Sequence, residues 1–191
     1  GISDFSKKYA IPIIIVAALT IFFVRRYIKT PKGKLKYHTL LLRIPVLKTV
    51  ITKVAIARFA RTFSSLMSSG VSVIESLEVT AASIGNKVLE NELLAAAREV
   101  KAGKQLSEPI TNSPHYPAIV GQMLAIGEET GETDEILVKI ADFYEEEVDA
   151  TIESLSSILE PLMIVILGGM VGLVAASVMG PMASLSSSIT K

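Results

Sequence analysis

The chain has 191 residues, half of them hydrophobic, with equal numbers of basic and acidic side chains and no cysteine. The absence of cysteine excludes disulfides, thiolate catalysis and cysteine metal sites. With only two histidines, His38 and His115, a histidine-based zinc site is not expected either. Because the chain begins with Gly1 rather than Met, we expect it to be a piece of a longer protein.

The net charge of zero conceals a strong asymmetry along the chain. From Glu128 to Glu160 there are twelve acidic residues and a single basic one, Lys139. Between Phe5 and Ile74 there is no acidic residue, and all the charges are basic: Lys7, Lys8, Arg25, Arg26, Lys29, Lys32, Lys34, Lys36, Arg43, Lys48, Lys53, Arg58 and Arg61. A basic front and an acidic back predict specific pairing, within one copy or between copies.

Residues 9–25 are predicted to form a first transmembrane helix, after an extracytoplasmic tail of residues 1–8. The stretch Tyr9–Val24 is uncharged and is bracketed by pairs of basic residues. It is slightly shorter than the roughly 20 residues of a typical span, but snorkelling of the flanking Lys and Arg side chains can make up the difference. A signal peptide is the alternative, and the lack of a small-residue cleavage site argues against it.

Residues 26–54 form a basic juxtamembrane segment. The positive-inside rule places this segment in the cytoplasm. Its simplest role is contact with anionic lipid headgroups, and nucleic-acid binding is a poor alternative for a membrane-tethered arm without interleaved aromatics. The predicted contact residues are Arg25, Arg26, Lys29, Lys32, Lys34 and Lys36.

Residues 55–160 are predicted to form a cytoplasmic domain of six helices, the first of which already begins at Pro45. No stretch alternates apolar and polar residues as a strand would. Proline, serine and glycine punctuate the region as helix starts and stops, with a capping box at Ser72 and Glu75. The expected helices cover 45–69, 72–84, 86–103, 107–111 and 117–130, followed by a sixth that continues to the membrane.

The sixth helix shows an apolar stripe with the three-four spacing of an amphipathic helix. The stripe comprises Ile136, Leu137, Ile140, Phe143, Tyr144, Val148, Ile152, Leu155 and Leu159. At Pro161 this helix meets a charge-free run that predicts a second transmembrane helix over 161–184, followed by an extracytoplasmic tail of residues 185–191. A bundle joined rigidly to a membrane helix can transmit a push or a twist.

Small residues spaced four apart lie in the second predicted span: Gly168, Gly172 and Ala176. This spacing allows helices to approach closely in lipid. It predicts a helix–helix contact, either within one copy or between copies.

A crowded acidic turn contains Glu128, Glu129, Glu132, Asp134 and Glu135. The plainest interpretation is a solvated turn whose acids favour the start of the next helix. The alternatives are a docking surface for a basic partner, or a weak divalent cation site without the spacing of an EF-hand loop.

No catalytic constellation is present. The sequence lacks a GxxxxGK[ST] phosphate loop and the GxSxG and HExxH motifs. His115 lies in a proline-rich turn with no acid nearby in sequence, and we expect it to be an ordinary loop residue. The sequence therefore predicts an all-α protein, a six-helix cytoplasmic bundle between two transmembrane helices, with no catalytic residue, metal or cofactor.

Four segments of the chain carry a family resemblance. They are ARFARTFSSLMSSGVSVIESL (Ala57–Leu77), VKAGKQLSEPI (Val100–Ile110), YPAIVGQMLAIGEETGETDEIL (Tyr116–Leu137) and ADFYEEEVDATIESLSSILEPLMIVILG (Ala141–Gly168). Together they resemble the GspF/PilC family of inner-membrane platform proteins from type II secretion and type IV pilus systems. The order of the segments and the combination of GEExG and EPL ahead of a terminal span make the resemblance specific. This chain differs in having Tyr116 before Pro117 where the family usually has Phe, and Thr133 where it has Leu.

The resemblance implies two similar six-helix cytoplasmic domains and three spans in the whole protein, with this chain as its second half. It implies a homo-oligomer in the bacterial inner membrane that couples a hexameric assembly ATPase to the assembly of pilins or pseudopilins. A transporter or channel subunit and a membrane-tethered signalling adaptor are the alternatives. Neither the run Tyr9–Val24 nor residues 161–184 contain a charged residue, which argues against the transporter.

Overall fold

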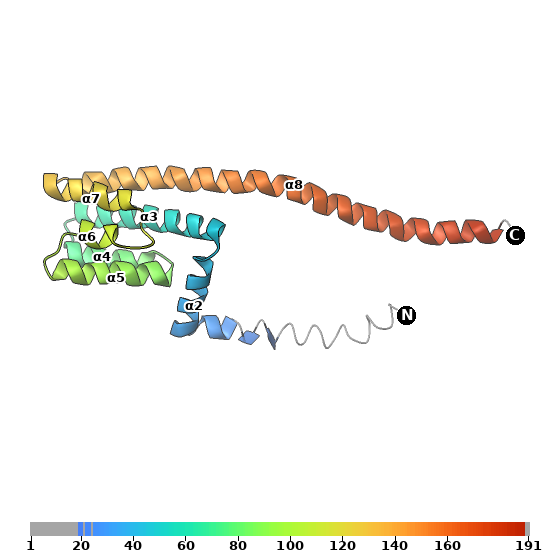
Figure 1. The fold of residues 1–191 in the computed structure, drawn as a ribbon, viewed down its shortest axis with the longest axis horizontal. Helices are drawn as coiled ribbons and strands as arrows, with labels where there is room; N and C mark the ends of the chain where they lie inside the picture. Colours follow the sequence, from blue (N-terminus) through green and yellow to red (C-terminus); the bar gives the residue numbers. More distant parts are fainter. Residues whose placement is uncertain (1–18, 21, 24, 190–191) are drawn as a thin grey trace. The chain divides into compact units, whose positions relative to one another are not determined.

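The computed structural model describes residues 19, 20, 22, 23 and 25–189, and this part of the chain is helical, with only turns and short loops between helices (Figure 1). The all-α prediction is therefore confirmed. The first predicted span and the tail before it fall for the most part outside the described residues. The elements are α2 (Pro31–Leu41), α3 (Pro45–Ser68), α4 (Val73–Ser83), α5 (Lys87–Lys101), α6 (Ser107–Thr111), α7 (Ala118–Thr130) and α8 (Thr133–Ile189).

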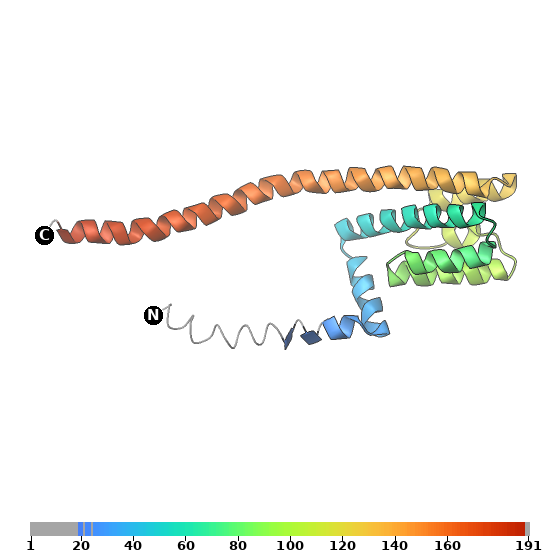
Figure 2. The ribbon, with the colours of Figure 1, turned by 180° about the vertical axis from the view of Figure 1, so that it is seen from behind.

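The chain divides into two compact units, one up to Glu146 and one from Glu147 onward. The first unit contains α2 to α7 and the first turns of α8. Within it, α3 packs on α4, α4 on α5 and α6 on α7, and Figure 2, from behind, shows α4 and α5 side by side as in Figure 1.

The helices begin and end at the residues that the sequence marks. Pro45 occupies the first turn of α3, where its missing N–H costs nothing. The Ser72 hydroxyl accepts the backbone N–H of Glu75 at 3.4 Å at the start of α4, and Asn86 Oδ1 accepts that of Val88 at 2.9 Å at the start of α5. Gly131, in the left-handed conformation with φ 76°, ends α7. These predicted boundaries are confirmed.

The core of the first unit is built from aromatic and aliphatic side chains on α3 to α8. Phe59 and Phe63 are stacked with ring centroids 5.6 Å apart, and Phe59 also meets the edge of Tyr116 at 6.1 Å. Burying large apolar side chains like these is the main stabilising contribution to such a bundle. The largest buried side chains include Ile56, Phe59, Phe63, Leu77, Leu89, Leu93, Ile110, Val120, Leu124, Leu137 and Ile140.

Helix α2 was not foreseen within the basic juxtamembrane segment. The Thr30 hydroxyl caps its start by accepting the N–H of Gly33 at 3.1 Å, and Pro31 is in its first turn. Gly33 is buried, and a Cβ there would collide with the backbone of Tyr27. The lysines interleaved through α2 hide any amphipathic period, so the periodicity argument did not detect a helix.

The apolar stripe predicted on α8 is correct only in part. Leu137, Ile140 and Tyr144 are buried in the core, but Phe143 is 55 % exposed. In a helix each residue is turned about 100° from the next, so Phe143 points away from the face that Tyr144 buries. Further along, Ile152 and Leu159 are also exposed.

The second unit consists of the remainder of α8. Among the described residues one helix is long and apolar enough to cross a membrane, and none of the described side chains in its apolar stretch is buried. Val165 and Leu173 are each 71 % exposed. The helix continues past residue 184, where the span was predicted to end, to Ile189.

Candidate partner-binding site

The acidic turn between α7 and α8 has a closely fixed backbone. After Gly131 the N–H of Glu132 donates back to the carbonyl of Gly127 at 2.9 Å, the bond that defines a Schellman cap. A Cβ on Gly127 would come within 3.0 Å of Thr133 Cα and 3.2 Å of Ile136. Helix α7 therefore approaches α8 closely here, and the turn is held by packing as well as hydrogen bonds.

Of the five acids predicted at this turn, Glu128 has an internal role. Its carboxylate accepts the backbone N–H of Leu106 at 2.6 Å and that of Ser107 at 3.2 Å. These are the first free N–H groups of α6, which has no side-chain cap of its own. A carboxylate there satisfies two donors that would otherwise be orphaned.

The other four acids are exposed: Glu129, Glu132, Asp134 and Glu135. None of them forms an ion pair with another described residue, so their carboxylates are open to a basic partner. Asp134 and Glu135 lie in the first turn of α8, where negative charge complements the helix dipole.

Within the described ranges no group of three or more His, Cys, Asp or Glu side chains is placed to hold a metal ion. The docking hypothesis stays a prediction.

A residue of the basic N-terminal part of the chain pairs with residues of the acidic C-terminal part within one copy. Arg61 on α3 forms a bidentate pair with Glu145 on α8, with Nε–Oε1 2.9 Å and Nη2–Oε2 2.8 Å, and also contacts Asp142. Hydrogen bonding to Arg61 lowers the pKa of Glu145. Because all three side chains are partly exposed, water screens the pairs. They orient α8 on α3 more than they stabilise it.

Helix α2 is linked to the core through His38. Its Nδ1 accepts the backbone N–H of Lys87 at 2.6 Å, at the first turn of α5. Burial lowers the pKa of His38, with a further contribution from the positive charge of Lys34 and an opposing one from Glu90. Sequence reasoning missed this contact, because nothing local connects residues 49 positions apart.

Acidification is expected to loosen α2 from α5. The contact needs an unprotonated Nδ1, and the pKa of His38 is lower in the folded protein than the ordinary value of about 6.5. The stability it contributes is therefore fully present above pH 6.5 and lost as the pH falls through the lower folded value. The protection factor of the Lys87 amide, which is the intrinsic exchange rate at a given pH divided by the observed rate, should fall in that window. His38→Gln, which keeps a non-titrating acceptor, should abolish the pH dependence; an unchanged profile would contradict this assignment.

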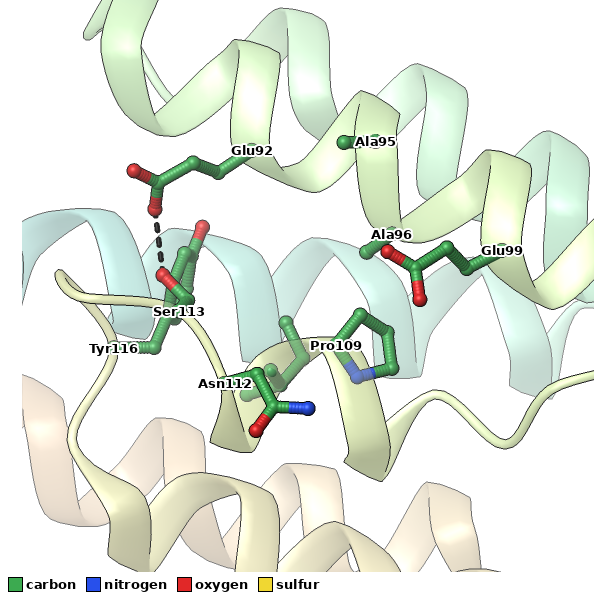
Figure 3. A pocket seen from close by; sticks show the side chains of 9 residues that line it. Glu92, Ala95, Ala96, Glu99, Pro109, Asn112, Ser113 and Tyr116 are labelled. Atoms are coloured by element: carbon green, nitrogen blue, oxygen red, sulfur yellow. Dashed lines mark hydrogen bonds between the residues drawn. The ribbon is translucent and has the colours of Figure 1, made fainter.

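A small pocket with both polar and apolar lining lies between α5 and the α6 region (Figure 3). Glu92 accepts a hydrogen bond from Ser113 Oγ at 2.6 Å, and its other oxygen lies 2.5 Å from His115 Nδ1. The acid next to His115 thus comes from α5, which the local sequence did not indicate. These hydrogen bonds hold the loop that contains His115 against α5. The Ser113 hydroxyl and the His115 imidazole each bond to Glu92 rather than to each other, so they do not form the direct nucleophile–base hydrogen bond of a catalytic triad.

The ring of Tyr116 lines the same pocket, with its hydroxyl directed toward α5 (Figure 3). Burial raises the pKa of this phenol, so it stays protonated at physiological pH. Its oxygen has no hydrogen-bond partner among the described residues. The ring, through its contact with Phe59, performs the packing at this position.

The other predicted site residues are exposed. Arg25, Arg26, Lys29, Lys32, Lys34 and Lys36 all reach solvent, and none is ion-paired with a described residue. Gly168 and Gly172 have open space around them, and the side chain of Ala176 lies outside the described part. Neither lipid contact nor span packing is tested by this geometry, and both stay predictions.

The fold and charges define an all-helical protein that combines a compact helical unit with an apolar helix long enough to cross a membrane. Residues 59–181 match the family described as "Type II secretion system (T2SS), protein F". The chain belongs to this family.

Three relatives illustrate the similarity. Type IV pilus assembly protein PilC of Thermus thermophilus is 40% identical over 183 residues, covering 95% of this chain and 45% of the relative. PilC of Myxococcus xanthus is 38% identical over 174 residues, 91% of this chain and 42% of the relative. Type II secretion system protein F of Pseudomonas aeruginosa is 28% identical over 186 residues, covering 97% of this chain and 46% of the relative. The chain spans less than half the length of each of these relatives.

Proposed function

We propose that this chain is part of an inner-membrane platform that couples a hexameric cytoplasmic assembly ATPase to the assembly of pilins or pseudopilins. The single observation that carries this proposal is the family match over residues 59–181. Relatives in the family are named for type IV pilus assembly and for type II secretion. The role is mechanical coupling and needs no catalytic residue or cofactor in this chain.

Helix α8 is suited to the coupling role. Its first turns are fixed in the core by Leu137, Ile140 and Tyr144 and oriented by the ion pairs of Arg61. The same helix runs on into the apolar stretch. A partner that pulls on the acidic turn would act directly on the end of this helix.

The proposed topology follows the charge pattern. Helices α3 to α7 with the start of α8 form a six-helix cytoplasmic domain over about 55–160, between spans at 9–25 and 161–184, with both tails extracytoplasmic. Homo-oligomers would form through close contact of the second span at Gly168, Gly172 and Ala176.

Charge reversal at the acidic turn tests ATPase docking. We expect Glu129→Lys with Glu132→Lys to weaken binding of the assembly ATPase to the full chain in nanodiscs about tenfold or more, since like charges across an interface are strongly unfavourable. Glu75→Lys with Glu78→Lys, on the exposed side of α4, is the matched control and should leave the dissociation constant unchanged. Equal effects of the two pairs would refute the acidic turn as the docking surface, although the family assignment would stand.

A further inference from the structure

The corner between α2 and α3, defined here as residues 29–50, exposes large apolar side chains in the first unit. Leu40 is 58 % exposed and Val46 is 53 % exposed. In α3, residues 45–49 are exposed, Ile51 already packs against the core and full burial begins at Ala55, so the first turn of this helix extends beyond the packed bundle. The exposed apolar side chains of the corner are Leu35, Tyr37, Leu40, Ile44, Val46 and Leu47.

Cations are interleaved with these apolar side chains, and no acid accompanies them. Lys29, Lys32, Lys34, Lys36, Arg43 and Lys48 are all exposed, and none of the six is ion-paired with a described residue. Arg61, by contrast, is neutralised by two carboxylates. Exposed leucines are unfavourable in water, and the clustered positive charges repel one another, so a partner that is both anionic and apolar suits this surface.

One part of the corner has a shape suited to such a partner. Leu35, Lys36, Thr39, Leu40 and Arg43 line a shallow groove along α2. The leucines supply an apolar surface, and the two cations lie beside it. Lys and Arg can lay their apolar stems along a hydrocarbon surface while their charges stay at the phosphate level.

The corner is preformed on the bundle. His38 binds the start of α5, Leu42 is buried, and Gly33 permits the tight start of α2. Pro31 follows the end of the predicted first span at residue 25 by six residues, a reach of at most about 20 Å even for extended chain. The corner therefore lies within reach of the headgroups at the cytoplasmic end of that span.

We propose that the α2–α3 corner binds the surface of an anionic phospholipid bilayer, with Leu35, Leu40 and Leu47 at the headgroup–acyl boundary and the cations on lipid phosphates. This inference rests on the membrane location in the proposed function and adds a specific contact that orients the domain on the membrane. The acidic segment of a second copy would satisfy the charges but not the leucines, whereas the interface of a bilayer satisfies both.

Because the chain has no cysteine, a spin label can be attached at one introduced cysteine without labelling any other site. Leu40→Cys and, as a control on the exposed side of α4, Val79→Cys each give a single site for a nitroxide label in the full chain. The label's collision rates with a water-soluble nickel complex and with oxygen report whether it lies in water or lipid. In nanodiscs of phosphatidylcholine with one quarter phosphatidylglycerol, we expect collisions with nickel at residue 40 to be at least about fivefold fewer than at residue 79.

Charge reversal supplies the second arm. Each cation near an anionic surface contributes about fivefold in partition, so Lys36→Glu with Arg43→Glu should return residue 40 to water. Arg98→Glu with Lys101→Glu, at the far end of α5, is the matched control and should not. If the label at residue 40 collides with nickel as often as the label at residue 79 in anionic discs, the proposal is overturned.

Two further outcomes would also overturn the proposal. In the first, the label at residue 40 is protected from nickel equally well in discs with and without anionic lipid, and its protection increases with the number of chains per disc. That result would assign the corner to contact between copies. Failure of the chain to enter nanodiscs would remove the membrane location on which the proposed function also rests. ATPase binding to the same discs separates the two proposals, because its loss with residue 40 still in lipid contradicts only the proposed function.

Discussion

Replacing Gly121 with alanine is expected to lower the free energy of unfolding of the helical unit by about 2–3 kcal/mol. A Cβ at this position would collide with the Thr111 hydroxyl and would lie 2.9 Å from the Thr111 backbone nitrogen. A backbone atom cannot move aside as a side chain can. The collision therefore outweighs the gain of about 1 kcal/mol that alanine normally brings to a helix. Thermal unfolding of the chain in detergent micelles, followed by circular dichroism, should show a midpoint lower by roughly 10 °C.

Two companion variants identify the cause of this loss. Thr111→Ala with Gly121→Ala removes the hydroxyl but leaves the backbone contact, and should recover only part of the stability. Gly127→Ala meets its neighbours at 3.0–3.2 Å, so a shift of a few tenths of an ångström relieves it, and its loss should be smaller. If Gly121→Ala unfolds at the same temperature as the native chain, then α6 and α7 do not approach as closely as the structure has them.

The helices that the sequence predicted are those whose ends are marked by chemistry local to the chain. Pro45, Ser72, Asn86 and Gly131 each satisfy or remove a helix-end requirement within a few residues, so the marks can be read without knowing the fold. Helix α2 had such a mark as well, Thr30 before Pro31, but the lysines that follow obscured its periodicity.

The contacts that shape the candidate site could not be predicted, because they join residues far apart in sequence. The charge asymmetry did predict pairing between front and back, yet Arg61 and Glu145 are 84 residues apart and many other pairs were equally possible. Phe143 shows a limit of local periodicity as a guide to which side chains are buried. It fits a three-four pattern with Ile140, but only the packed core shows that Tyr144 occupies the buried face.

The sequence offered the five acids of the turn together as one candidate docking surface, and the structure divides them. Glu128 uses both oxygens inside the domain, while Glu129 and its neighbours face solvent. A motif of adjacent glutamates therefore combines a structural residue with residues free to bind a partner. Mutations that treat the turn as one unit would confuse misfolding with lost docking.

Replacing Glu128 with alanine is expected to cost about 2 kcal/mol of domain stability, because it leaves the N–H groups of Leu106 and Ser107 without an acceptor. Both residues are buried, so water cannot readily take the place of the carboxylate. Hydrogen exchange at these two amides should accelerate, and the unfolding temperature should fall. Glu129→Ala, one residue further on and exposed, should change the stability by no more than about 0.5 kcal/mol.

Comparison with Glu128→Gln shows how much of this stability one uncharged acceptor oxygen can supply. The amide keeps one acceptor oxygen, so this variant should retain part of the stability that alanine loses. If ATPase docking depends on the exposed acids, Glu128→Gln should bind the ATPase normally at temperatures where the domain stays folded, whereas Glu129→Lys with Glu132→Lys should bind weakly while remaining stable. The reverse result, a stable Glu128→Gln chain that does not bind, would place the docking contact on the carboxylate that caps α6 and would require α6 to open when the partner arrives.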